Sequence, residues 1–280
     1  MSTKLFDGIS VTFCRFEKEH AHTHVADENV IEIDYCHDGR IGWDMGDGNR
    51  IFMGKGDFWI HTLRECADSR VSLPGDHYEG LCVTLDLSVL GSNPPSVFDG
   101  TEADFSVLKT RFCVGGDSSC FSGNERTNAL FSAFYAEKDN LSAAELRISA
   151  LNLMLYLLRA EPSKLSRPAE YESAQVEIIH SVHAYLLEHI CERTTIEQLS
   201  RLFAMNPTTL KSLFKAVYGD SIASHTKAHR MEAAARLLTN TSLSLNEVAS
   251  AIGYESQSRF SAAFRETYGK LPSEYRKQEV

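Results

Sequence analysis

The sequence predicts an α+β protein of two domains, a β-rich amino-terminal domain with added helices followed by an all-helical carboxy-terminal domain. Its 280 residues exceed the size of one typical domain. Short runs of β-branched and aromatic residues fill residues 9–90, and a helical pattern in the last third occurs twice. We place the domain boundary in the polar stretch around Pro162 and Pro168, which gives domains 1–165 and 166–280.

Strand-like runs alternate with turn residues in the amino-terminal region. The runs are 9–16, 30–36, 41–45, 50–53, 58–61 and 81–87. The pairs Asp38-Gly39 and Asp47-Gly48 and the stretch Pro74-Gly75 separate some of them, and Asp-Gly supplies the positive φ angles of tight hairpins. This spacing predicts a small antiparallel barrel or sandwich.

After the strand-like region the apolar residues follow the spacing of a helix and form one stripe. It consists of Leu141, Ala144, Ile148, Leu151, Leu155 and Leu158, spaced by three and four residues. We expect this helix to pack on the sheet. Because the same steps form a heptad seam, the alternative is that the stripe joins two copies of the chain in a homodimer.

The charge is distributed unevenly. Residues 175–280 hold 12 Lys+Arg and 11 Asp+Glu, a net charge of +1, whereas residues 1–174 hold 16 and 27, a net charge of −11. The overall −10 argues against a chain that coats nucleic acid or lipid indiscriminately. No apolar run is long enough to span a membrane, Asp7 interrupts any signal peptide, and the seven scattered cysteines indicate reduced thiols, so we predict a cytoplasmic protein.

The repeat in the last third appears when the sequence is shifted by 50 residues. Pairs that coincide are Thr194/Ser244, Glu197/Glu247, Asn206/Ser256, Leu210/Phe260, Phe214/Phe264, Tyr218/Tyr268 and Gly219/Gly269. The first two pairs form capping boxes and the glycines suit helix ends. Each copy therefore predicts a short helix, a turn and a second helix, which is the helix-turn-helix arrangement. A long helix over residues 222–238 would hold the two second helices about 34 Å apart, one turn of DNA.

These residues carry a resemblance to a known family. The carboxy-terminal hundred residues resemble the DNA-binding domain of AraC/XylS-type transcriptional regulators, most closely over RMEAAARLLTNTSLSLNEVASAIGYESQSRFSAAFRETYGKLPSEYRK. The amino-terminal domain resembles a cupin-like barrel in His22-x-His24, in residues 32–35 and in the turn before Asp57. The resemblance implies a bacterial regulator that binds a double-stranded DNA operator, with RNA polymerase as a partner if it activates, and a first domain that binds a small effector or dimerises.

The second helix of each copy supplies the candidate DNA contacts, because its exposed face near the N-terminus reaches base edges. The candidate base-reading residues are Thr208, Thr209, Lys211, Ser212, Gln257, Ser258, Arg259, Ser261 and Ala262. The candidate phosphate contacts are Asn206, Lys215, Ser256, Arg265, Lys270 and Arg276. We expect the first copy to discriminate bases more strongly, because Ala262 can only touch a thymine methyl.

Three alternating histidines, His20, His22 and His24, keep an enzyme alternative open: a metal-dependent cupin enzyme with a fused helical domain. A second alternative is a helical adaptor, which a basic face across both second helices would argue against. Because the second half of a cupin metal motif is poorly matched, we predict no catalytic residue, no bound metal and no cofactor. The candidate effector-lining residues are His22, His24, Tyr35, Trp43 and Trp59.

Overall fold

The computed structural model describes residues 2–17, 20–21, 25–44, 49–66, 70–75, 77–113, 119–135, 142–166 and 171–278. The chain divides into two compact units, Met1–Ser173 and Ala174–Val280. The first is built around an antiparallel sheet and the second consists of helices, which confirms the two-domain α+β prediction. Within the described ranges, the structure contains no helix with the length and apolar character needed to cross a membrane.

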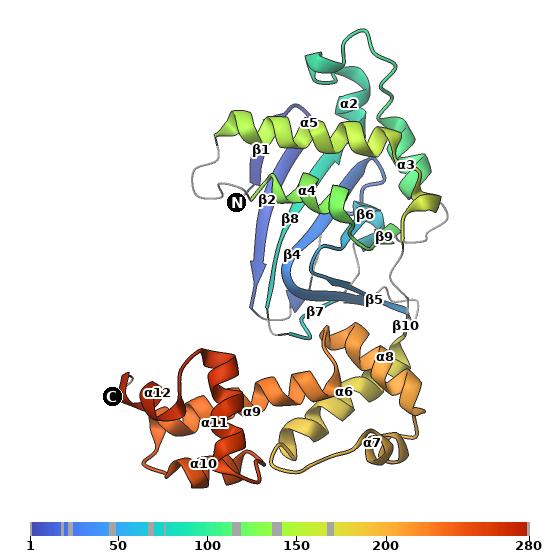
Figure 1. The fold of residues 1–280 in the computed structure, drawn as a ribbon. Coiled ribbons are helices and arrows are strands. Elements are labelled where there is room, and N and C mark those ends of the chain that lie inside the picture. The colour runs from blue at the N-terminus through green and yellow to red at the C-terminus, as the bar shows by residue number, and fades with distance from the viewer. Residues whose placement is uncertain are drawn as a thin grey trace. The chain divides into compact units, whose positions relative to one another are not determined.

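The sheet of the amino-terminal unit is open. Its strands are β1 (Ser2–Phe6), β2 (Ile9–Phe16), β3 (His20–Ala21), β4 (Val30–Asp44), β5 (Asn49–Gly54), β6 (Phe58–Thr62), β7 (Arg70–Ser72), β8 (Tyr78–Asp86), β9 (Ser119–Phe121) and β10 (Tyr171–Glu172). The main path runs β1-β2-β8-β4-β5-β10, with β6 and β7 also paired to β4. Every pair is antiparallel, and Figure 1 shows the strongly curved β4 at the centre.

Strand β4 is continuous through Asp38-Gly39, where the sequence predicted a hairpin. The pair instead forms a bulge, at which the register against β8 shifts between Cys36 and Asp38. Gly39 has a φ of 79°, and a Cβ at that position would overlap the carbonyl oxygen of His77. The positive φ was therefore expected correctly, but it serves to bend one strand rather than to reverse the chain. As a result the first half of β4 pairs with β6 and β8, and the second half pairs with β5 and β7.

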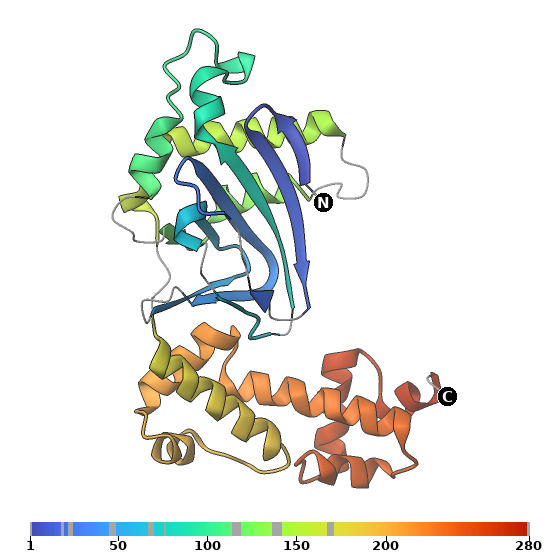
Figure 2. The same ribbon diagram turned by 180° about the vertical axis from the view of Figure 1, so that it is seen from behind.

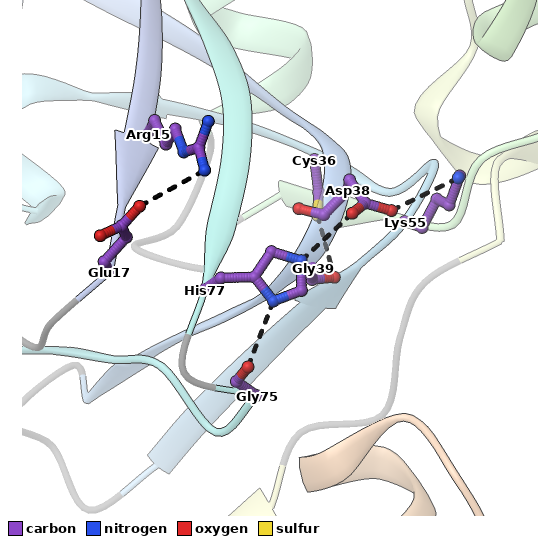
Figure 3. A network of polar contacts seen from close by, with 8 residues as sticks. All are labelled: Arg15, Glu17, Cys36, Asp38, Gly39, Lys55, Gly75 and His77. Carbon is purple, nitrogen blue, oxygen red and sulfur yellow. Dashed lines mark hydrogen bonds and ion pairs between the residues drawn. The ribbon is translucent and has the colours of Figure 1, made fainter. Parts of the chain in front are cut away.

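Polar side chains hold the bulge in place (Figure 3). The Asp38 carboxylate lies 3.1 Å from Nε2 of His77 and 3.4 Å from Nζ of Lys55. The other ring nitrogen of His77, Nδ1, donates to the carbonyl of Gly75 at 3.2 Å. With Nδ1 occupied in this way, the Nε2 contact favours the protonated ring. The Asp38 hydrogen bond accordingly raises the pKa of His77, and the same bond lowers the pKa of Asp38.

The described residues of this unit also form five helices. They are α1 (Leu63–Cys66), α2 (Leu87–Ser92), α3 (Ser106–Phe112), α4 (Glu125–Ser132) and α5 (Ala143–Arg159), with 3-10 turns at Ser96–Phe98 and Pro162–Lys164. Figures 1 and 2 show α4 and α5 lying across the same face of the strands. Alternate residues of β4, among them Ile31, Ile33 and Tyr35, join Phe131 and Leu153 in the core beneath these helices. A second core on the opposite face contains Trp43 and Trp59.

Helix α5 confirms the predicted helix but uses a different face from the one expected to pack. Its buried residues are Leu146, Ser149, Ala150, Leu153, Met154 and Leu157. In the stripe that we expected to be buried, the side chain of Ile148 is 59% exposed and that of Leu155 is 39% exposed. Leu151 and Leu158, at the edge of that stripe, are half-buried and pack against the core. Residues two positions apart on a helix lie about 200° apart around its axis, so the chain has two apolar stripes on nearly opposite faces. Periodicity alone could not decide which stripe the sheet would cover.

The carboxy-terminal unit consists of seven helices in its described residues. They are α6 (Ser173–Glu188), α7 (Ile196–Leu202), α8 (Pro207–Tyr218), α9 (Ile222–Asn240), α10 (Leu245–Ala251), α11 (Gln257–Tyr268) and α12 (Pro272–Gln278). Figure 1 shows α9 running from the group of α6, α7 and α8 to the group of α10, α11 and α12. The two short-helix pairs, α7–α8 and α10–α11, are the two predicted helix-turn-helix copies.

Candidate nucleic-acid interface

In the first copy, side-chain caps fix where both helices begin. Thr195 caps α7 in a capping box with Gln198, one residue later than the Thr194–Glu197 box expected from the sequence. Asn206 caps α8 by accepting hydrogen bonds from the backbone N–H groups of Thr208 and Thr209 at 3.1 and 2.9 Å. Helix α8 ends at Gly219, whose φ of 85° is the left-handed conformation that glycine adopts without cost.

The second copy repeats these features. Ser244 and Glu247 form the expected capping box of α10, Ser256 caps α11, and Gly269 ends α11 with a φ of 72°. The second helices are related by the 50-residue shift, whereas the first helices and their caps are related by 49. The extra residue lies in the turn of the second copy. This accounts for the misplaced first box, because an ungapped alignment cannot absorb a longer turn.

The two second helices each bury one face and expose the other. In α8 the buried residues include Leu210, Leu213 and Phe214, and in α11 they are Phe260 and Phe264. The opposite faces define two stripes, which we call the 208–215 stripe (Thr208, Lys211, Ser212 and Lys215) and the 258–265 stripe (Ser258, Ser261, Ala262 and Arg265). Each follows the spacing i, i+3, i+4 and i+7, so its members share one side of the helix.

The predicted base-reading residues lie at or beside these stripes. The exposed ones are Thr208, Lys211, Ser212, Gln257, Ser258, Arg259 and Ala262. Thr209 and Ser261 are half-buried, and Oγ1 of Thr209 accepts a hydrogen bond from Nδ2 of Asn206 at 2.8 Å. Thr209 is therefore a second member of the α8 cap, while the seven exposed side chains offer surface for contact.

Cations occur on the exposed faces of both second helices. Lys211 and Lys215 lie on α8, and Arg259 and Arg265 lie on α11, all with exposed side chains. Arg259 also pairs with Glu255 at 3.1 Å, an exposed contact between residues one helical turn apart that can exchange for another anion at little cost. A basic face on both helices is the feature expected of a DNA-binding protein rather than of a helical adaptor.

Arg276 differs from the other predicted phosphate contacts. Its Nε and an Nη donate to the carbonyl oxygens of Leu238 and Leu243, at 3.2 and 2.6 Å. These carbonyls lie at and just beyond the last turn of α9, where helices leave acceptors unsatisfied. Asn206, Lys215, Arg265 and Lys270 have exposed side chains, and Ser256 is half-buried at its cap. The geometry gives Arg276 a structural role in this unit.

Sequence reasoning missed a similar role for Arg230. Its guanidinium donates from Nε to the carbonyl of Ile190 at 2.7 Å and from Nη2 to that of Glu192 at 2.8 Å. Arg230 thereby joins the middle of α9 to the chain that follows α6. Lys227 on α9 pairs with Glu266 on α11 at 2.8 Å. These contacts connect α9 to the segment between α6 and α7 and to the second copy. A match to a family pattern at Arg230 gives no indication of which carbonyls it binds.

The predicted effector residues belong to the amino-terminal unit and do not share one environment. His22 and His24 lie outside the described residues. Tyr35 stacks on Phe131 with ring centroids 4.4 Å apart, beneath the helices. Trp43 and Trp59 contact each other on the opposite face of the sheet, with centroids 4.7 Å apart. The described aromatic residues therefore do not line a single pocket.

A polar cluster that the sequence reading did not select lies on the same strands. His61 is buried, with Nδ1 donating to the carbonyl of Thr62 at 3.1 Å and Nε2 facing Asp34 at 2.8 Å. The proton in that second contact lies between the ring and the carboxylate. Burial, and then the charge of Asp34, raise the pKa of Glu32 to about 7. The alternation of side chains along β4 could have predicted that Glu32 and Asp34 share one face. It could not have predicted that His61 lies beside them.

Comparison with known proteins is consistent with this geometry. Residues 199–278 match a family of helix-turn-helix domains. The xylose operon regulatory protein of Escherichia coli strain K12 is 31% identical over 231 residues, covering 78% of this chain and 56% of that protein. The transcriptional regulator ExsA of Pseudomonas aeruginosa is 29% identical over 131 residues, covering 47% of this chain and 46% of that protein. This chain thus spans about half the length of these relatives.

Among solved structures, the DNA-binding domain of the global transcriptional factor AdpA, crystallised with a target DNA, is 29% identical. The match covers 36% of this chain and 90% of that one, with a TM-score of 0.35. The matched domain and the relatives are those of transcriptional regulators and not of enzymes. The carboxy-terminal region of the chain is therefore an AraC-type helix-turn-helix domain, and the relatives that the chain matches are transcriptional regulators.

Proposed function

We propose that this protein is a sequence-specific transcriptional regulator that reads two adjacent major-groove segments of one DNA operator, about one helical turn apart. The observation that carries this proposal is the repeated geometry of the 208–215 and 258–265 stripes on two capped second helices. Helix α9, with 19 residues, is about 28 Å long, which is comparable with the roughly 34 Å repeat of DNA. One rigid helix of that length suits two recognition helices that enter successive grooves.

The side chains of the two stripes suggest that α8 and α11 discriminate between bases to different extents. Lys211 on α8 can donate to the O6 and N7 acceptors of guanine, while Thr208 and Ser212 accept several partners. On α11, Gln257 suits adenine and Arg259 suits guanine, but Ala262 offers only a methyl group to thymine. We assign stronger base discrimination to α8, and phosphate contacts to the capped helix starts at Asn206 and Ser256 together with Lys215, Arg265 and Lys270.

The amino-terminal unit would then regulate the DNA-binding unit. Its sheet would bind a small effector, and an effector with different affinities for DNA-competent and incompetent states would shift their populations. The exposed apolar stripe of α5, with Ile148 and Leu155 at its centre, supports a homodimer through that helix. We propose further that the protein acts in the cytoplasm as an activator, with RNA polymerase as its partner on DNA.

Two lysines on one helix provide the test of the reading assignment. An operator is first recovered by selection from random duplex DNA with the full-length protein, and each position is then varied. Lys211→Ala is expected to cost about 1–3 kcal/mol on the preferred sequence and to relax the preference at one position. Lys215→Ala serves as the matched control, since loss of a phosphate contact weakens all sequences uniformly. Uniform weakening by both substitutions would refute the assignment.

A further inference from the structure

Three histidines from two helices converge in the carboxy-terminal unit. His225 and His229 are one turn apart on α9, and Nε2 of one lies 3.1 Å from Nε2 of the other. His183 on α6 faces both, with its ring centroid 4.9 Å from that of His225 and 5.6 Å from that of His229. One nitrogen from each ring lies within 4.8 Å of the other two. Only the spacing of His225 and His229 could have been noticed in the sequence.

These separations suit a metal ion. Zinc binds imidazole nitrogen at 2.0–2.1 Å, which places two ligand nitrogens about 3.4 Å apart in a tetrahedral site. The Nε2 atoms of His225 and His229 already lie close to that spacing. His183 would need a side-chain adjustment on the order of 1 Å to bring its nitrogen into the same range. All three side chains are half-buried, so the site is accessible to an ion and partly shielded from water.

A carboxylate orients one of the rings for this purpose. Nδ1 of His229 lies 3.2 Å from Oε2 of Glu232, one turn further along α9. A proton on Nδ1 is held by that contact, which leaves the lone pair of Nε2 directed toward His225. Histidine ligands of metals commonly donate their other ring N–H to a carboxylate in this way.

We propose that His183, His225 and His229 form a binding site for a divalent transition-metal ion, with Zn²⁺ as the ion that suits three imidazoles and an exchangeable fourth ligand. The bound ion would join α6 to α9. It would also fix the end of α8, because the ring of Tyr218 stacks on that of His183 with centroids 4.4 Å apart. Metal binding would therefore stabilise α6, α8 and α9 together.

Cobalt provides the direct probe, since Co²⁺ takes the same tetrahedral sites and absorbs visible light. Reduced full-length protein, freed of metal with a chelator, is titrated with CoCl₂ and then with ZnCl₂. We expect the wild type to bind one equivalent of Co²⁺ with a spectrum typical of histidine ligands, and Zn²⁺ to displace that ion. His225→Gln and His229→Gln should each abolish this binding. Glu232→Gln should weaken it about 10- to 100-fold. His189→Gln is the matched control, because its ring stacks on Tyr185 away from the cluster.

The difference between wild type and variants is the readout, because other histidines and the cysteines can also bind cobalt. Equal cobalt stoichiometry and affinity in wild type and in the His225→Gln/His229→Gln variant would overturn the proposal. Nitrogen-15 spectra of labelled histidines in the wild-type protein give an independent test that needs no variant. Zn²⁺ should shift the resonances of three rings together at one equivalent, and unchanged histidine resonances would also overturn the site.

Discussion

Gly253, in the turn between α10 and α11, lies directly against the carbonyl oxygen of Cys191, beyond the end of α6. A Cβ on Gly253 would overlap that oxygen and the carbonyl carbon, and the φ of Gly253 is 78°. Arg230 binds the carbonyls on either side of Cys191, those of Ile190 and Glu192. The second copy and the chain after α6 are thereby held together, which is what a fixed spacing between α8 and α11 requires.

Gly253→Ala should therefore destabilise the carboxy-terminal unit by about 3 kcal/mol, through a positive φ and a backbone overlap combined. Gly269→Ala is the matched control: its φ of 72° is similar, but a Cβ there meets no atom within 4 Å, so it should cost about 1 kcal/mol. Chemical denaturation followed by circular dichroism measures both. Equal losses from the two substitutions would show that the contact with Cys191 does not matter.

Substitution of Arg265 should affect the affinity for DNA, whereas substitution of Arg276 should affect the stability of the fold. Arg265→Ala is expected to weaken DNA binding on all sequences and to reduce the salt slope by about 1, with stability changed by less than about 0.5 kcal/mol. Arg276→Ala removes the donors to the carbonyls of Leu238 and Leu243, and should cost about 1–3 kcal/mol of stability. Binding isotherms at several salt concentrations, paired with denaturation curves, distinguish the two. If Arg276→Ala instead reduces the salt dependence of DNA binding and leaves stability unchanged, Arg276 contacts a phosphate as the sequence predicted.

Charges introduced on the exposed stripe of α5 should disrupt the homodimer that we propose. Ile148→Glu and Leu155→Glu each place a carboxylate in the apolar seam, and we expect the dimer to dissociate at least about 10-fold more readily, because a buried unpaired charge is costly. Ala143→Glu, at an exposed position in the first turn of α5, is the control. Sedimentation equilibrium of the full-length protein gives the masses. An unchanged association constant in both stripe variants would exclude α5 as the dimer interface.

The stability of the amino-terminal unit should depend on pH through Glu32. Its pKa of about 7 in the folded protein exceeds the ordinary 4.5, so between these values the folded state binds more protons than the unfolded state. Stability from this group is therefore fully present below about pH 4.5 and is lost as pH rises through 7, by up to about 3 kcal/mol. Glu32→Gln should flatten this dependence.

Tryptophan fluorescence measures that pH dependence in one unit alone. The chain has two tryptophans, Trp43 and Trp59, and both lie in the amino-terminal unit. Urea unfolding at pH 5, 6, 7 and 8 should give a falling free energy of unfolding in the wild type relative to Glu32→Gln. If the difference between the two proteins stays constant across this range, Glu32 does not titrate as proposed.

The carboxy-terminal unit could be predicted closely because its signals are local. The caps at Asn206 and Ser256 and the helix-ending glycines act within a few residues, and both copies repeat them. What could not be predicted depends on contacts distant in sequence. Arg276 reaches a carbonyl 38 residues away, and His183 meets His225 only when α6 lies beside α9. The face of α5 that packs and the bulge at Gly39 likewise depend on partners in other strands and helices.

The most direct test of the two-reader account changes the spacing within the operator. Once selection has identified two enriched blocks, about five base pairs are inserted between them, which rotates one block by half a turn to the opposite face of the DNA. Because α9 is one continuous helix, we predict that affinity for the altered operator falls at least about 100-fold, nearly to the level of either block alone. Affinity that is unchanged by the insertion would show that the two helix-turn-helix copies do not read DNA together.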